Sequence, residues 1–242
     1  MKLLKFLYSI YALIMFTLVF LFWSPFLLFG VWFKSLSKSV LRLKHIVAKS
    51  FFISIFMPYS IKYDKNINFT KQYVVIANHF SYFDIPAFVA INIPMKLIGK
   101  LAVSNIPLLG YIFKGLHIHV DRNDKESRKK TYLESYKSID DGFNVGLFPE
   151  GGIKTEKVPK MAEFKDGAFA IALKKRIPIL PVSLPDAYKI MKGSFLLSWH
   201  KCNIICHEPI STKGYSLENL EEFKKKCYDV LDFELRKNFS PD

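Results

Sequence analysis

The sequence of 242 residues predicts an α/β fold, a largely parallel sheet flanked by helices, behind an N-terminal helical segment embedded in a membrane. Two observations predict this fold. After Pro58, short apolar runs alternate with longer segments of helical periodicity, which favours a parallel sheet covered on both faces. Before Pro58, the chain is strongly apolar and contains no acidic residue. We therefore divide the chain into a membrane anchor, residues 1–57, and a globular domain, residues 58–242.

The net charge of +14 is unevenly distributed along the chain. Residues 1–63 contain eight Lys and Arg and no Asp or Glu, so they carry +8 of this charge. An evenly basic chain would indicate nucleic acid, whereas basic charge that coincides with strong hydrophobicity indicates an anionic membrane surface. We therefore expect membrane lipids as partners and no nucleic acid.

The anchor begins with 28 uncharged residues, Phe6 to Phe33. A single helix of this length would measure about 42 Å, more than the roughly 30 Å of a hydrocarbon core. Pro25 removes a backbone donor and predicts a kink or a turn. Two interpretations stay open, namely one tilted, kinked span or a re-entrant hairpin with its turn near Pro25. Bases flank both ends of the run, so the positive-inside tendency favours the hairpin and a globular domain on the cytoplasmic face.

The rest of the anchor, residues 34–57, mixes bases with apolar residues at helical spacing. This pattern predicts an interfacial helix whose bases meet anionic lipid headgroups. The alternative is a second helix packed against the protein core, with lysines that extend to solvent. Both interpretations keep the chain at the membrane.

The sequence pattern of the globular domain predicts six buried strands and five helices in alternation. The strands are expected at Tyr73–Ala77, Lys96–Ile98, Ile118–Val120, Asn144–Phe148, Ile177–Val182 and Asn203–Cys206. The helices are expected at Ile85–Ile91, Leu108–Lys114, Lys125–Asp141, Phe164–Lys175 and Leu217–Lys237, with Gly142 ending the third and residues 58–69 forming a junction.

A first candidate site, Asn78 to Asp84 (NHFSYFD), directly follows a predicted strand. Open α/β sheets bind ligands beyond the carboxyl ends of their strands. An Asp five positions after His79 can hold one imidazole nitrogen and leave the other free as a general base. A structural alternative uses the same segment, since Ser81 and Asp84 match a capping box and Pro86 suits a first helical turn.

Two further segments follow predicted strands. In Phe148 to Gly152 (FPEGG), the glycines let backbone N–H groups approach an anion, although a plain turn has the same composition. Arg122 follows another strand, where its guanidinium could bind a phosphate or simply face solvent. His117 and His119 lie two residues apart, but no third ligand is evident, so we expect no metal site.

Taken in order, these motifs resemble the glycerophospholipid acyltransferase family, in particular the 1-acylglycerol-3-phosphate (lysophosphatidate) acyltransferases. Asn78–Asp84 matches the N-H-x-x-x-x-D motif of the family, and Phe148–Gly151 matches its F-P-E-G core. Pro178–Val182 matches its fourth motif, so the resemblance runs from about Tyr73 to Pro185.

The resemblance implies the transfer of a fatty acyl group from an acyl thioester to the sn-2 hydroxyl of 1-acylglycerol-3-phosphate, which gives phosphatidate. It implies acyl-CoA or an acyl-carrier protein as co-substrate, and no other cofactor. His79 is then the general base, oriented by Asp84. The residues implied in binding lysophosphatidate are Lys114, Arg122, Glu150, Gly151 and Gly152.

The sequence departs from the family pattern in two places. Leu116 occupies the position of a Gly that is usual in the second motif, and Gly152-Ile153-Lys154-Thr155 follows where the third motif commonly continues with Thr-Arg-Ser. The missing Arg leaves open another lysophospholipid or a lyso-aminolipid as acceptor. A non-catalytic lipid-binding protein is the alternative from another class, but lipid binding alone would not require the His79–Asp84 pair.

Overall fold

The computed structural model describes residues 2–155, 157–191 and 196–239. Its centre is a seven-stranded sheet in the order β1-β7-β6-β2-β5-β3-β4. Neighbouring strands are parallel except for β6 and β7, which are antiparallel. The predicted α/β class with a mostly parallel sheet is therefore confirmed. The strands are β1 (Tyr59–Tyr63), β2 (Val74–Ala77), β3 (Met95–Lys100), β4 (Ile118–Val120), β5 (Asn144–Leu147), β6 (Ile179–Ser183) and β7 (Cys202–Cys206).

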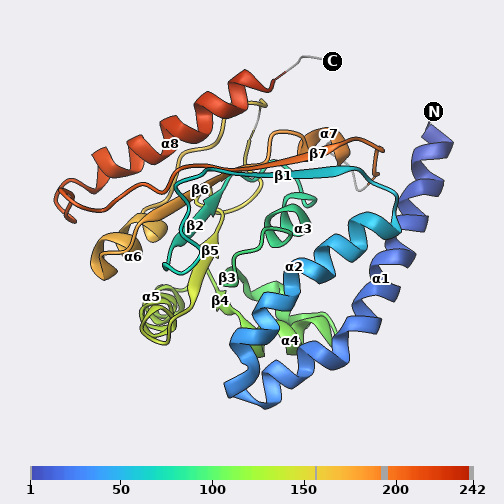
Figure 1. Cartoon of the computed structure of the whole chain (residues 1–242), viewed down its shortest axis with the longest axis horizontal. Helices are drawn as coiled ribbons and strands as arrows, with labels where there is room; N and C mark the ends of the chain where they lie inside the picture. Colours follow the sequence, from blue (N-terminus) through green and yellow to red (C-terminus); the bar gives the residue numbers. More distant parts are fainter. Residues whose placement is uncertain (1, 156, 192–195, 240–242) are drawn as a thin grey trace.

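Helices cover both faces of the sheet (Figure 1). One face carries the two N-terminal helices and α3, and the other carries α5, α6 and α8. All five predicted helices are present with shifted ends, and a short α7 was not predicted. The helices are α1 (Lys2–Trp32), α2 (Ser37–Ser54), α3 (Asp84–Val89), α4 (Leu109–Leu116), α5 (Lys125–Asp140), α6 (Gly167–Lys175), α7 (Ala187–Ile190) and α8 (Leu220–Lys237), with 3-10 turns at Lys34–Leu36 and Leu101–Asn105.

The C-terminus of α5 follows the glycine rule that the sequence predicted. Gly142 adopts a left-handed φ of +82°, and the N–H of Phe143 donates a 2.9 Å hydrogen bond to the carbonyl of Ser138. This six-to-one bond is the mark of a Schellman motif, in which glycine carries no steric penalty. The motif ends α5 and directs the chain into β5.

α1 is continuous through Pro25, so of the two interpretations of this apolar run the structure has the single helix and not the hairpin with its turn near Pro25. Pro25 has no N–H to donate to the carbonyl of Leu21, four residues earlier. The hydroxyl of Ser24 donates to that carbonyl instead, at 2.9 Å, and so replaces the missing hydrogen bond. The chain reverses only after Phe33, where a 3-10 turn leads into α2. Among the helices that the structure describes, α1 is the one long and apolar enough to cross a membrane.

α1 and α2 pack closely against each other near their connection. A Cβ placed on Gly30 would lie only 2.7 Å from the Cβ of Val40, so this glycine is what lets the two helices approach. α2 in turn packs on the sheet, and its Phe52 and its C-terminal neighbour Ile55 are fully buried. The inner side of α2 is therefore a core-packing surface, as the second interpretation of residues 34–57 predicted.

Each face of the sheet is covered by its own hydrophobic cluster. Along β2, Val75 and Ala77 belong to the cluster under α2 and α3, whereas Val74 and Ile76 belong to the cluster under α6 and α8. This alternation follows from the period of two in a strand, and both faces are apolar because helices cover both. The first cluster also contains residues of α1 and α2. The boundary that we placed at Pro58 therefore marks a change in composition. It does not separate two cores, because one hydrophobic cluster contains residues from both sides of it.

β1 is the one strand that the sequence did not predict. It lies at the edge of the sheet and pairs only with β7 among the described strands. Its sequence, YSIKY, places polar residues between apolar ones, and none of its residues is fully enclosed. A five-residue edge strand of this kind carries too weak an apolar signal to stand out from the junction in which it lies.

A lysine from α2 reaches the sheet and meets a histidine there. The amine of Lys44 donates a 2.7 Å hydrogen bond to the carbonyl of Met95 and lies 3.5 Å from Nε2 of His117. Nδ1 of His117 accepts from the N–H of Leu97 at 3.1 Å, so the proton of the neutral imidazole is on Nε2. Desolvation lowers the pKa of Lys44 to about 7 and, with the charges of Lys44 and Lys96, lowers the pKa of His117 well below its usual range.

Replacing Lys44 by methionine should remove a pH dependence of stability. Between pH 7 and the ordinary lysine value of 10.5, the unfolded chain holds a proton that the folded chain has lost, so the unfolding free energy rises with pH. From pH 7 to pH 9 the native protein should gain about 1–2 kcal/mol relative to Lys44→Met. Thermal unfolding of both proteins in detergent at the two pH values measures this difference.

The control is Lys38→Met, which removes an exposed lysine of the same helix and should keep the native pH dependence. Parallel pH profiles for Lys44→Met and the native protein would show that the amine of Lys44 is solvated rather than enclosed.

Candidate functional site

The candidate site lies at the edge of the sheet where the central parallel strands end. β2 lies between β6 and β5, and all three run in the same direction. His79 comes two residues after the end of β2, and Glu150 comes three residues after the end of β5. Two motifs that are 71 residues apart in the sequence are therefore brought to one place.

The imidazole of His79 is held by the carboxylate of Asp84. Nδ1 of His79 lies 3.0 Å from Oδ2 of Asp84, and the same oxygen accepts the N–H groups of Phe80 at 2.6 Å and Ser81 at 2.7 Å. An oxygen that receives two backbone donors acts as an acceptor, so Nδ1 carries the proton and Nε2 keeps its lone pair. The His79 side chain is 11% exposed and that of Asp84 is fully buried, so only the imidazole is accessible.

The capping box that the sequence suggested is half formed, by the same carboxylate. Asp84 begins α3 and accepts the N–H of Ser81, which is one of the two bonds of the motif. The hydroxyl of Ser81 does not complete it, but accepts from the N–H of Phe83 and donates to the carbonyl of Ala187. The structural and the chemical interpretation of this segment therefore share one oxygen atom.

Burial makes the ionised form of Asp84 costly. Its second oxygen, Oδ1, is buried and has no hydrogen-bond partner among the described residues. Desolvation raises the pKa of Asp84, and the hydrogen bonds from His79, Ser81 and Phe80 oppose this rise. A positive charge on the adjacent imidazole would stabilise the carboxylate further.

The turn after β5 fixes His79 from two sides. The backbone N–H of His79 donates a 2.6 Å hydrogen bond to Oε1 of Glu150. The imidazole stacks on the ring of Phe148, with ring centroids 4.1 Å apart and an angle of 15° between the planes. Phe148 in turn packs against Phe88 of α3, with ring centroids 5.1 Å apart. Backbone and ring of His79 are thus positioned by the F-P-E-G segment.

Glu150 is a positioning residue in this geometry. It is fully buried, and its second oxygen accepts the N–H of Ala162 at 2.9 Å and the hydroxyl of Thr155 at 3.1 Å. Desolvation raises the pKa of Glu150, and these hydrogen bonds and the one from His79 oppose the rise. The sequence-based hypothesis had Glu150 shaping the acceptor site directly, whereas its contacts connect it to the backbone of His79 and to the following loop.

Arg122 reaches the same turn from the end of β4. Its guanidinium donates a hydrogen bond to the carbonyl of Gly151, and a Cβ on Gly152 would lie 3.6 Å from Nη1 of Arg122. Gly151 and Gly152 have φ values of +76° and +149°, which side chains disfavour. Desolvation lowers the pKa of Arg122, but a guanidinium stays charged at neutral pH and has five N–H donors. An exposed cation therefore borders the turn, in position to bind an anion.

Lys114 is the one predicted site residue that the structure does not bring to this edge. It lies in the last turn of α4, which ends at Leu116, directly before β4 begins at Ile118. Arg122 follows the other end of β4, so the strand separates the two cations. The next residue after Lys114, Gly115, packs against Val31 at the end of α1. Proximity in sequence to Arg122 was misleading because a strand intervenes.

The contacts of two residues in the Asn78–Asp84 segment, Asn78 and Phe83, were not predicted from the sequence. The amide of Asn78 joins the ends of β2 and β6, because it donates to the carbonyl of Leu184 at 3.1 Å and accepts the N–H of Leu184 at 2.8 Å. Phe83, which directly precedes Asp84, packs on Phe51 and Phe52 of α2. The position of Asn78 next to His79 was a usable signal for the first, but nothing in the sequence paired Phe83 with α2.

The site has donors for an anion and lacks a metal-binding cluster. Across residues 2–155, 157–191 and 196–239, no three His, Cys, Asp or Glu side chains gather in a way that could hold a metal ion. Both ring nitrogens of His117 have other partners, since Nδ1 accepts the N–H of Leu97 and Nε2 lies 3.5 Å from the amine of Lys44. The groups that could meet a negatively charged substrate are the guanidinium of Arg122 and the backbone N–H of Gly152. The N–H of Gly151 is not available, because it donates to the carbonyl of Phe148 at 3.1 Å.

Comparison with known proteins gives one family. The family model described as Acyltransferase matches residues 60–185, just over half of the chain. A curated 1-acyl-sn-glycerol-3-phosphate acyltransferase from Chlamydomonas reinhardtii is 34% identical over 50% of this chain and 36% of its own length. The enzyme of the same name from Haemophilus influenzae is 25% identical over 66% of each chain. This chain thus spans between about a third and two thirds of these two relatives.

A solved structure resembles this chain over nearly its full length. The crystal structure of the 1-acyl-sn-glycerophosphate acyltransferase PlsC from Thermotoga maritima superposes with a TM-score of 0.82, at 26% identity, over 99% of both chains. The likeness therefore includes the two N-terminal helices as well as the sheet. By the family match over residues 60–185, with the His79–Asp84 pair and the F-P-E-G turn inside it, the chain belongs to the Acyltransferase family.

Proposed function

We propose that this chain transfers a fatty acyl group from an acyl thioester to the sn-2 hydroxyl of 1-acylglycerol-3-phosphate, which gives phosphatidate. The observation that carries the proposal is the His79–Asp84 pair at the edge of the sheet, in which Nε2 of His79 has no hydrogen-bond partner among the described residues. The names of the curated relatives support the substrate. A lipid-binding protein without catalysis would have no use for an imidazole positioned by two buried carboxylates.

In the proposed reaction, His79 is the general base. Nε2 of His79 takes the proton of the sn-2 hydroxyl as that oxygen attacks the thioester carbonyl. The C–O bond forms, the C–S bond breaks, and the departing thiolate receives the proton from the imidazolium. Asp84 keeps the proton of the neutral imidazole on Nδ1 and stabilises the imidazolium that forms.

The acceptor hydroxyl is itself the nucleophile, so no acyl-enzyme is required. The hydroxyl of Ser81 is buried and engaged with Phe83 and Ala187. The three cysteines are buried as well, and desolvation raises their thiol pKa values, most of all that of Cys202. A thiol with a raised pKa is a poor nucleophile.

Arg122 is the proposed ligand of the acceptor phosphate. It borders the Gly151–Gly152 turn, and the exposed Lys154 follows in the same loop. Lys114 lies at the other end of β4. Because few cations border the site and the third motif lacks its usual Arg, another lysophospholipid or a lyso-aminolipid is the second candidate acceptor.

The proposed location is a membrane, with the α/β domain on the cytoplasmic face. The 31-residue α1 exposes large apolar side chains along most of its length. The bases that follow its apolar run, Lys34, Lys38, Arg42 and Lys44, outnumber Lys2 and Lys5 at its start, which favours the cytoplasmic side for the α/β domain. Acyl-CoA and acyl-carrier protein are both compatible as the donor that approaches from that side. The residues proposed as the anchor, 1–57, would keep the site close to its lipid acceptor.

His79→Ala should abolish acyl transfer while the protein stays folded and membrane-bound. A general base contributes about 10²–10⁴-fold to a rate, so kcat should fall by at least about this factor. The assay uses purified protein, labelled lysophosphatidate and, in separate reactions, acyl-CoA and acyl-carrier protein thioesters. The control is His45→Ala. His45 lies on α2, 34 residues before His79 in the sequence, and is partly exposed. Full activity of His79→Ala would overturn the mechanism.

Arg122→Met should weaken the recognition of the acceptor phosphate specifically. Hydrogen bonds to charged groups contribute about 1.5–3 kcal/mol, so KM for lysophosphatidate should rise by about 10-fold to 100-fold. Turnover of monoacylglycerol, which lacks the phosphate, should change little. Lys130→Met on the exposed side of α5 is the control. Equal losses with both acceptors, or indifference of the native enzyme to the phosphate, would favour the second candidate acceptor.

Glu150→Gln should reduce kcat more than it changes KM. Both carboxylate oxygens accept backbone N–H groups, so the amide must turn a donor toward either His79 or Ala162. Either arrangement displaces the imidazole from its place or loosens the loop, and we expect kcat to fall about 10-fold or more. Glu163→Gln, an exposed glutamate in the same loop, should behave like the native enzyme. A changed KM with an unchanged kcat would instead mean that Glu150 acts on the acceptor.

A further inference from the structure

A cavity lies at the opposite edge of the sheet from His79, where the central parallel strands begin. Its volume is about 300 Å³, which is at the lower end of the range for small-molecule sites. Three segments form it, namely residues 66–73 before β2, residues 176–178 before β6 and residues 208–212 after β7. We call it the Arg176 cavity and define it by Lys71, Tyr73, Arg176, Pro178, Glu208 and Thr212.

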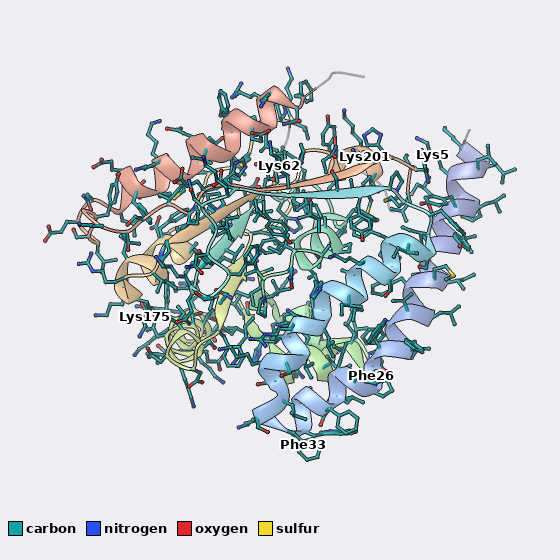
Figure 2. The ribbon with its side chains drawn as sticks, viewed as in Figure 1. Lys5, Phe26, Phe33, Lys62, Lys175 and Lys201 are labelled. Atoms are coloured by element: carbon teal, nitrogen blue, oxygen red, sulfur yellow. The ribbon has the colours of Figure 1, made fainter. Side chains whose placement is uncertain are left out.

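The Arg176 cavity is separate from the site of His79 and from the N-terminal helices. Tyr73 directly precedes β2 and His79 follows it, so about 20 Å of extended chain lies between them. Figure 2 shows Lys175, the last residue of α6 and the neighbour of Arg176, on the side of the molecule away from Lys5 in α1. The cavity therefore belongs neither to the acyl-transfer site nor to the proposed anchor.

Arg176 lines the cavity from a backbone conformation that does not suit an arginine. It ends α6 with a left-handed φ of +54°, where glycine or asparagine is favoured. Its Nη1 donates a 2.7 Å hydrogen bond to the carbonyl of Tyr215, which fixes the direction of the side chain. A guanidinium has five N–H donors, and this one has no ion-pair partner among the described residues. Strain retained at an unpaired cation indicates a use for that cation.

Two more groups that could meet an anion line the same cavity. Thr212 is only 5% exposed, and its hydroxyl has no hydrogen-bond partner in the described part of the chain. A polar group at a residue this deeply buried is costly unless it finds a partner. Lys71 is exposed and, across the described ranges, its amine has no ion-pair partner either. A guanidinium, an amine and a hydroxyl thus face one space with donors to spare.

Glu208 and the apolar walls restrict the kind of anion that fits. Glu208 is the one carboxylate among the described lining residues, and its Oε1 accepts from the amide of Asn66 at 2.9 Å. Its other oxygen can accept from a hydroxyl of a ligand. The apolar lining consists of Tyr73, Pro178 and Pro209, which is too little to enclose an acyl chain. Two cations, one carboxylate and few apolar groups suit a small molecule with a phosphate and hydroxyl groups.

We propose that the Arg176 cavity is a binding site for a small phosphorylated polyol. Arg176 and Lys71 bind the phosphate oxygens, the hydroxyl of Thr212 donates to the same group, and Glu208 accepts from a hydroxyl of the polyol. The ligand connects the segments that lead into β2 and β6, which already meet where the N–H of Val74 donates to the carbonyl of Pro178 at 3.1 Å. The inference does not depend on the acyl acceptor or on His79.

The test is calorimetric titration of the full chain in detergent with three probes, sn-glycerol 3-phosphate, inorganic phosphate and glycerol. We expect glycerol 3-phosphate to bind several-fold more tightly than phosphate, and glycerol alone not to bind. Arg122→Met should keep this binding, because Arg122 borders the other edge of the sheet. Absence of binding by glycerol 3-phosphate would overturn the proposal, and equal affinities for it and phosphate would show an anion site that does not recognise a polyol.

Two variants locate the bound ligand. Arg176→Asn keeps a residue that tolerates the left-handed φ and removes the guanidinium, so the affinity for glycerol 3-phosphate should fall about 10-fold or more. Thr212→Val has the same shape and removes a hydroxyl that has no partner among the described residues, so it should weaken binding while thermal unfolding stays close to native. Acyl transfer should persist in both.

The matched control is Lys174→Met, which removes an exposed cation of the last turn of α6 that is not part of the cavity wall. Its affinity for glycerol 3-phosphate should equal that of the native protein. Binding that survives both Arg176→Asn and Thr212→Val but is lost in Arg122→Met would place the ligand in the acyl-transfer site. That outcome would refute the second site and leave the proposed function intact. An equal loss in Lys174→Met would show a general effect of charge and would refute it as well.

Discussion

The geometry of the site depends on one buried oxygen atom, Oδ2 of Asp84. It receives the imidazole of His79 and the N–H groups of Phe80 and Ser81, so it fixes both the tautomer of the histidine and the path of the chain into α3. The five-residue spacing of His79 and Asp84 is what the turn between β2 and α3 requires to close on this atom. The same oxygen atom therefore orients the imidazole of His79 and holds the turn that leads into α3.

The N-terminal helices extend this dependence to the rest of the chain. Phe83, the residue before Asp84, packs on Phe51 and Phe52 of α2, and the core under α2 and α3 is one cluster that also includes Ala12 of α1. An anchor attached only by a linker could be removed without cost to the body. Here its removal would expose the hydrophobic face on which α3 rests, so the position of His79 depends on α2.

The sequence predicted what local patterns determine and missed what is decided by contacts across the fold. Apolar runs located six of the seven strands, but the weakly apolar β1 needed β7 as a partner to be recognised. Pro25 predicted a kink or a turn, and left a hairpin open, because the compensating hydroxyl of Ser24 could not be foreseen. The F-P-E-G motif was identified, yet the role of Glu150 was not, since its partner is a backbone N–H 71 residues away. Lys114 was grouped with Arg122 because sequence distance ignores the strand between them.

The two carboxylates of the site also act on each other. Desolvation raises the pKa values of both Asp84 and Glu150, and the charge of Asp84 raises that of Glu150 further. Each ionised carboxylate is therefore destabilised in the resting site, and their hydrogen bonds compensate this only in part. A proton taken up by His79 places a positive charge next to Asp84, whose Oδ2 lies 3.0 Å from Nδ1 of the imidazole. The negative field that costs stability in the resting protein thus favours the imidazolium that the proposed acyl transfer must form, without any rearrangement of the surrounding groups.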